Sequence, residues 1–122
     1  VSGGELSRIM LAIKKVLSEN SQLPTIIFDE IDSGVSGEIS NKMAHIMSQM
    51  SQQMQVITIT HLPQIAAKGN QHYKVYKEEL NNTTTTSLKQ LSEDERIVEI
   101  AEMLSGKNIS DSALTHAREL LN

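Results

Sequence analysis

Two adjacent carboxylates, Asp29 and Glu30, end a short apolar run that begins at Thr25. A run this short and rich in β-branched residues is typical of a buried parallel strand, and open α/β sheets bind ligands at the carboxyl ends of such strands. Because successive side chains of a strand point to opposite faces, the two acids must have different tasks. We expect Asp29 to reach Mg²⁺ through water and Glu30 to orient or deprotonate an attacking water. The pair indicates phosphoryl transfer to water.

A histidine, His61, directly follows a second apolar run at residues 56–60. If both runs are parallel strands, His61 lies at the same sheet edge as Asp29 and Glu30. A lone histidine is more often structural, but at this position its imidazole can donate a hydrogen bond to a γ-phosphate. The other histidines are interpreted as surface residues: His45, His72 and His116.

The segment Ser2-Gly3-Gly4-Glu5 opens a predicted helix. A helix N-terminus presents free N–H groups and a partial positive charge, and glycines let a phosphate approach the backbone. An ordinary capping box explains Ser2 and Glu5 but not two adjacent glycines, which are costly near a helix start. Anion binding and simple helix capping therefore both stay open at this stage.

The composition limits the class of protein. The chain has 122 residues, a net charge of −4, no cysteine and 2% aromatic residues. These values argue against a disulfide framework, a basic surface for nucleic acid and a base-stacking platform. No apolar run is long enough to span a membrane. Because Val1 opens the chain without an initiator Met, we expect a piece of a longer protein.

The hydrophobic spacing predicts the elements that position these residues. A helix of roughly four turns carries an apolar stripe: Leu6, Ile9, Met10, Ile13, Val16 and Leu17. A second, methionine-rich helix separates the two strands, so helix–strand–helix–strand predicts a parallel α/β layer. After Gly69, alternating residues around Asn81-Asn82 predict a β-hairpin at the edge of the sheet. Two helices follow, the first capped by Ser92 and ended by Gly106.

These motifs together resemble one family of nucleotide hydrolases. Residues 2–5 are similar to the signature motif of ABC-type ATPases, and Ile26 to Glu30 to their Walker B strand. Residues 33–37 fall where the D-loop belongs, and His61 falls where the switch histidine belongs. Longer strings (SGGELSR, DEIDSGVSG and THLPQIA) resemble the RecN family, bacterial relatives of the SMC proteins that act in DNA repair, and this resemblance covers essentially the whole chain.

The resemblance implies an α/β fold: the C-terminal half of an ABC-type, P-loop ATPase head, with parallel strands flanked by helices and an edge β-hairpin. It divides the chain into a motif-bearing core at 1–68, the hairpin at 69–91 and a helical pair at 92–122. It implies ATP and Mg²⁺ as cofactors, and heads that close in pairs on ATP and open on hydrolysis, in repair and recombination of DNA double-strand breaks. It also implies a nucleoid-associated, cytoplasmic protein without a membrane partner.

The resemblance also assigns roles to residues. Glu30 and His61 become catalytic residues and Asp29 the Mg²⁺ ligand. The signature residues act in trans on the ATP of a second head: Ser2, Gly3, Gly4 and Glu5. The D-loop residues are Ser33, Gly34 and Ser36, although Ser36 stands where many ABC proteins have Asp.

The resemblance further implies partners outside these residues. No Gly-x-x-x-x-Gly-Lys-Ser/Thr loop occurs in the sequence. The phosphate-wrapping loop is then expected in an N-terminal half of the same head, joined through a coiled coil. A second head would complete a homodimer, and DNA would be contacted by the full-length protein.

Two alternative functions fit parts of the sequence less well. An ABC transporter ATPase subunit usually has Pro after the Walker B glutamate, whereas Ile31 follows Glu30 here. A non-enzymatic head-interaction module is disfavoured for a full-length protein because Asp29, Glu30 and His61 are all present, although it could hold for this segment alone.

Overall fold

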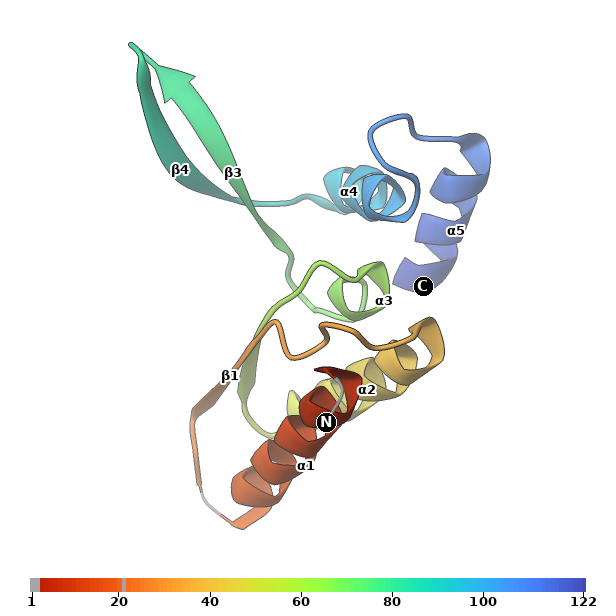
Figure 1. Cartoon of the computed structure of the whole chain (residues 1–122). Helices are drawn as coiled ribbons and strands as arrows, with labels where there is room; N and C mark the ends of the chain where they lie inside the picture. The colour runs from red at the N-terminus through yellow and green to blue at the C-terminus, as the bar shows by residue number, and fades with distance from the viewer. Residues whose placement is uncertain (1–2, 21) are drawn as a thin grey trace. The chain divides into compact units, whose positions relative to one another are not determined.

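The computed structural model describes residues 3–20 and 22–122, and the chain forms two compact units. One unit ends at Lys68 and the other runs from Gly69 to Asn122. Figure 1 shows the elements of each unit coloured along the chain. Each unit is described by itself.

The first unit alternates helices and strands. Its elements are α1 (Gly3–Asn20), β1 (Thr25–Asp29), α2 (Gly37–Met50), β2 (Gln55–Ile59) and the short α3 (Pro63–Ala66). Strands β1 and β2 pair in parallel, from Thr25 opposite Gln55 to Asp29 opposite Ile59. The predicted parallel layer is confirmed. Helix α3 was not predicted, although Pro63 in its first turn is a recognised start signal.

The core of this unit lies between α2 and one face of the β1–β2 pair. Strand β1 buries Ile26 and Phe28, and the latter has no exposed surface. The methionine-rich stripe of α2 is core, as predicted. The buried cluster comprises Leu11, Ile26, Phe28, Met43, Ala44, Met47, Met50 and Ile65.

The other face of the strand pair is open within the described residues. Ile27 is 52% exposed, Ile57 43% and Ile59 50%. These side chains share one face because the parallel register sets Ile27 beside Ile57. Parallel sheets are normally covered on both faces, so this face has the composition of a surface that another segment covers.

Helix α1 turns its apolar stripe away from this core. From Gly4 to Asn20, only Ser7 and Leu11 are buried. The predicted stripe is exposed by 38–56% at every position: Leu6, Ile9, Met10, Ile13, Val16 and Leu17. An amphipathic helix normally faces its apolar stripe to a core. The periodicity predicted the helix, but the buried side is a different one.

Lys14 links α1 to the free edge of β1. Pro24 O accepts from Gln55 N, and Glu30 N donates to Ile59 O. Since alternate residues of a strand bond to the same neighbour, the Ile27 carbonyl points to the opposite edge, where the Lys14 ammonium donates to it. The same ammonium lies 4.9 Å from the centroid of the Phe28 ring. A lysine at a strand edge disfavours pairing with another chain.

The second unit opens with a long antiparallel hairpin. Strands β3 (Tyr73–Leu80) and β4 (Thr83–Gln90) pair along their whole length. The two-residue turn has positive φ at Asn81 (53°) and Asn82 (61°), as a type I′ turn requires. The hairpin itself is confirmed. The prediction that it lies at the edge of the parallel sheet is wrong for the described residues, because β3 and β4 form a sheet of their own.

Two capped helices, α4 (Glu93–Ser105) and α5 (Asp111–Leu121), pack together after the hairpin. Ser92 and Glu95 form the predicted capping box, and Ser110 accepts from Ala113 N at the start of α5. Gly106 follows α4 with φ 81°, a conformation that favours glycine. The helices bury Ile100, Ala101, Ala113 and Ala117.

One histidine of this unit differs from its interpretation as a surface residue. His72 is half-buried, and burial, with a smaller contribution from the Arg96 guanidinium, lowers the pKa of its imidazole. Arg96 is itself buried and donates to the Gly69 carbonyl over 2.9 Å. An ion pair of 2.7 Å joins Lys74 to Glu99 nearby and raises the pKa of the lysine.

Candidate functional site

The parallel register brings the predicted catalytic residues to one edge. Asp29 is the last residue of β1 and stands opposite Ile59, the last residue of β2. Glu30 follows β1 and His61 follows β2 by two residues. All three side chains are exposed. The structure thus places Asp29, Glu30 and His61 at the carboxyl edge of the strand pair, where α/β sheets bind ligands.

Glu30 has a backbone conformation that glutamate rarely adopts. Its φ is 52°, in the left-handed region, which costs an L-residue about 1–2 kcal/mol. The turn is held on both sides: Glu30 N donates to Ile59 O over 2.9 Å, and its carbonyl accepts from the Ser33 hydroxyl over 3.1 Å. Strain of this kind clusters at functional sites, and here it re-aims the glutamate relative to the aspartate before it.

The sequence predicted no role for Asp32. This aspartate is 1% exposed, and its Oδ2 accepts a hydrogen bond from the Thr60 hydroxyl. The Thr60 oxygen in turn accepts from Leu62 N over 3.0 Å. A second acid two residues after Glu30 was visible in the sequence, but its burial and its contact with Thr60 were not.

The start of α1 packs against the predicted D-loop. A Cβ on Gly4 would lie 3.1 Å from the Gly34 carbonyl oxygen, and the Ser7 hydroxyl lies 3.5 Å from the Ser33 carbonyl. Gly34 has φ 77°. Close backbone packing therefore accounts for Gly4 without a phosphate.

Other residues of these two motifs are placed as follows. Ser2 and the surroundings of Gly3 lie outside the described residues, and Glu5 is exposed in the first turn of α1. Ser36 is the N-cap of α2, and its hydroxyl accepts from Ile39 N over 3.4 Å. A cap is a sufficient structural reason for a serine at this D-loop position.

The chemistry of the donor set bears on the expected cation. Within residues 3–20 and 22–122, no cluster of three or more His, Cys, Asp or Glu side chains gathers as a metal cage. Mg²⁺ keeps several waters and commonly takes one or two carboxylates together with substrate phosphates. An exposed Asp29 fits that mode of binding, and its role as a ligand stays a prediction.

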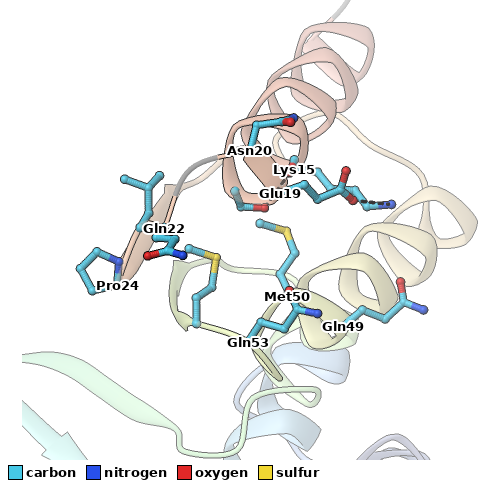
Figure 2. A pocket seen from close by; sticks show the side chains of 11 residues that line it. Lys15, Glu19, Asn20, Gln22, Pro24, Gln49, Met50 and Gln53 are labelled. Carbon is cyan, nitrogen blue, oxygen red and sulfur yellow. Dashed lines mark hydrogen bonds and ion pairs between the residues drawn. The ribbon is translucent and has the colours of Figure 1, made fainter.

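A hollow lies at the other end of the strands. A cavity of about 700 Å³ is bounded by the ends of α1 and α2 and by the residues that precede β1 and β2. Figure 2 shows its mostly amide and methionine lining, with the Lys15–Glu19 ion pair of 3.9 Å on one side. Since no predicted catalytic residue lines it, the candidate site is the carboxyl edge.

Among the described helices, none is long and apolar enough to cross a membrane.

The chain has the fold of SMC ATPase heads. The Smc head of Pyrococcus yayanosii matches with a TM-score of 0.70 at 20% identity, over 88% of this chain and 20% of that one. The SMC head of Thermotoga maritima matches with a TM-score of 0.58 at 23% identity, over 75% of this chain and 34% of that one. A structure from work on ATP-driven dimerization and DNA-stimulated activation of SMC ATPases has a TM-score of 0.63 at 21% identity, over 78% and 56%. At such low sequence identity, these structural matches show the fold and nothing about function.

Relatives that are similar in sequence narrow the class of protein to one family. The chain is 46% identical to the DNA repair protein RecN of Bacillus subtilis over 120 residues, which are 98% of this chain and 21% of that protein. It is 48% identical to RecN of Deinococcus radiodurans over 98% of this chain and 21% of that protein, and 43% identical to RecN of Haemophilus influenzae over 99% and 22%. The chain belongs to the RecN family and spans about a fifth of the length of the curated relatives that it matches. No protein-family model matches it.

Proposed function

We propose that the carboxyl edge of the β1–β2 pair forms part of the ATP-hydrolysing site of a RecN-type ATPase head. The full-length protein would work in DNA repair, at the nucleoid in the cytoplasm. In this proposal Glu30 orients or deprotonates the attacking water, His61 donates to the γ-phosphate, and Asp29 holds the hydrated Mg²⁺. The bound cation would neutralise charge that develops on the phosphates. The observation that carries the proposal is the in-register β1–β2 pair, which sets the three side chains on one edge.

The signature motif is proposed to act on a second head. An SMC ATPase of the same fold is described as dimerizing on ATP and responding to DNA. In this segment, the contact of Gly4 with Gly34 joins the signature helix to the D-loop. A nucleotide bound by a partner head would then meet Ser2, Gly3, Gly4 and Glu5, with Ser33, Gly34 and Ser36 beside it.

Most of the binding affinity for ATP is proposed to come from residues outside this sequence. The 122 residues contain no Walker A lysine, and that loop makes most of the contacts to the phosphates in P-loop ATPases. We expect the purified segment to show no saturable ATPase activity. Saturable hydrolysis that survives further purification would contradict this expectation.

The separate tasks of the two acids can be tested in the full-length protein. Glu30→Gln keeps the shape of the side chain and loses the base, so we expect ATP binding to persist while kcat falls about 10²- to 10⁴-fold. Asp29→Asn is the matched variant, and it should weaken Mg²⁺-dependent nucleotide binding instead. Equal binding defects in both variants would refute the division of roles.

The proposed action of the signature motif on the nucleotide of a second head can be tested separately. Ser2→Arg would put a bulky cation where a partner's γ-phosphate is expected, so ATP binding should persist and ATP-dependent head closure should be lost. Size-exclusion chromatography with light scattering measures closure. Normal dimerization of the Ser2→Arg homodimer would contradict the assignment.

A further inference from the structure

The buried carboxylate of Asp32 joins the two turns that carry the proposed catalytic residues. It stands two residues after Glu30, and its partner Thr60 stands one residue before His61. The last backbone bond between the two chain segments, from Glu30 N to Ile59 O, comes just before this contact. The contact between Asp32 and Thr60 therefore continues the link between the segments where the β-ladder has ended.

The burial of this acid calls for an explanation. A carboxylate with 1% exposure is costly unless it is well partnered. Its Oδ2 receives the Thr60 hydroxyl, but within the described residues its Oδ1 is buried with no hydrogen-bond partner. A buried polar atom without a partner is uncommon in native structures and usually marks a functional constraint or a missing group.

The direction of the hydrogen bonds shows what the contact controls. The Thr60 hydroxyl donates its proton to Asp32, so its oxygen is left to accept from Leu62 N at 3.0 Å. That amide lies on the far side of His61. The threonine thus orders the backbone on both sides of the histidine, while the aspartate fixes the rotamer of the hydroxyl.

We propose that Asp32 is a positioning residue that, through Thr60, holds His61 in a fixed geometry relative to Glu30. The inference deepens the proposed function and rests on it. It adds a residue that touches no reacting atom and acts by setting the relation between the two residues that do.

The test uses the full-length protein and two breaking variants, Asp32→Ala and Thr60→Val, each with a matched control. Asp32→Asn keeps an acceptor for the threonine, and Thr60→Ser keeps the hydroxyl. We expect the breaking variants to lower kcat about 10- to 100-fold, as misplacement of reacting groups does, with little change in the KM for ATP. The controls should restore most of the lost activity. The double variant Asp32→Ala/Thr60→Val should lose no more than either single one, since both break one contact.

A second measurement tests the contact between Asp32 and Thr60 without relying on catalytic activity. Hydrogen exchange of the Leu62 amide should be faster in Thr60→Val than in Thr60→Ser, with the overall thermal unfolding unchanged. If Asp32→Ala fails to fold, Thr60→Val still decides the question because Thr60 is only partly buried.

The outcomes separate the two proposals. Wild-type kcat in Thr60→Val, in a protein whose hydrolysis is abolished by Glu30→Gln, would overturn the role of Asp32 and leave the proposed function standing. Additive losses in the double variant would also overturn it. Wild-type hydrolysis in Glu30→Gln would refute the proposed function and this inference together, whatever the exchange rate of the Leu62 amide.

Discussion

The two units of this chain are stabilised in different ways. In the unit from Gly69 to Asn122, neighbours in sequence make most of the contacts: a two-residue turn, a capping box and a capped α5. In the unit that ends at Lys68, the strands that pair are separated by α2, and the cluster around Phe28 draws on residues from Leu11 to Ile65.

The difference extends to their surfaces. The first unit exposes apolar side chains along α1 and on the open face of β1 and β2. The second exposes them mainly on its hairpin, at Tyr73, Val75, Leu80 and Leu88, whereas its helices expose mostly polar side chains. A parallel layer with one open face lacks part of its normal cover. The unit that holds the proposed site therefore depends mainly on long-range contacts, whereas the other unit depends more on local ones.

The largest effect is expected in the core of the first unit. Phe28→Ala removes a side chain with no exposed surface and should lower the free energy of unfolding of that unit by about 3–5 kcal/mol. Ile27→Ala, its 52% exposed neighbour in β1, is the control and should change stability far less. Urea titration of the 122-residue segment measures both. Equal losses would show that the open face of β1 is covered after all.

The exposed stripe of α1 should make the segment self-associate. Ile9→Lys, at a position that is 50% exposed, should weaken self-association at least about tenfold, or about 1.4 kcal/mol. Light scattering over a concentration series measures the constant, and Lys68→Ala is a control outside the stripe. The Lys14 contact argues that association uses the stripe rather than the edge of β1. A wild-type segment that stays monomeric at high concentration would contradict this prediction.

The local capping of the second unit can be removed without touching its core. Ser92→Ala deletes the hydroxyl that accepts from Glu95 N and should cost that unit about 1 kcal/mol. The midpoint of its urea unfolding reports the loss, and Ser87→Ala in β4 is the comparison. A loss of several kcal/mol would mean that the cap also supports contacts that the local rules do not include.

The smallest expected effect is a loss of stability of the second unit at acid pH. Hydrogen bonds from Lys89, and then from Ser92, lower the pKa of Glu95 from 4.5 to about 2. Because the folded pKa is lowered, this stabilisation is fully present above pH 4.5 and is lost as the pH falls toward 2. Glu95 is on the surface, so salt should reduce the effect. Unfolding curves of wild type and Glu95→Gln should converge through this range, and a constant gap between them would refute the assignment.

Much of the architecture followed from the sequence because short-range rules govern it. The capping box joins Ser92 to Glu95, three positions further on, the turn consists of Asn81 and Asn82, and Gly106 ends α4. Apolar runs that end in Asp29 and precede His61 predicted parallel strands with a polar carboxyl edge, and the register bears this out. For the cap, the turn and the end of α4, the deciding contacts lie within one element or at its ends.

Tertiary structure alone decided the rest, because those features join residues far apart in the chain. The contact of Asp32 with Thr60 bridges 28 positions, and no periodicity marks it. Which side of α1 is buried depends on where α2 lies, so the apolar stripe predicted the helix but not its orientation. The left-handed φ of Glu30 is imposed by the Ile59 carbonyl on one side and Ser33 on the other. Residue types and spacing predict where a reaction could take place, and long-range packing sets how those residues are held.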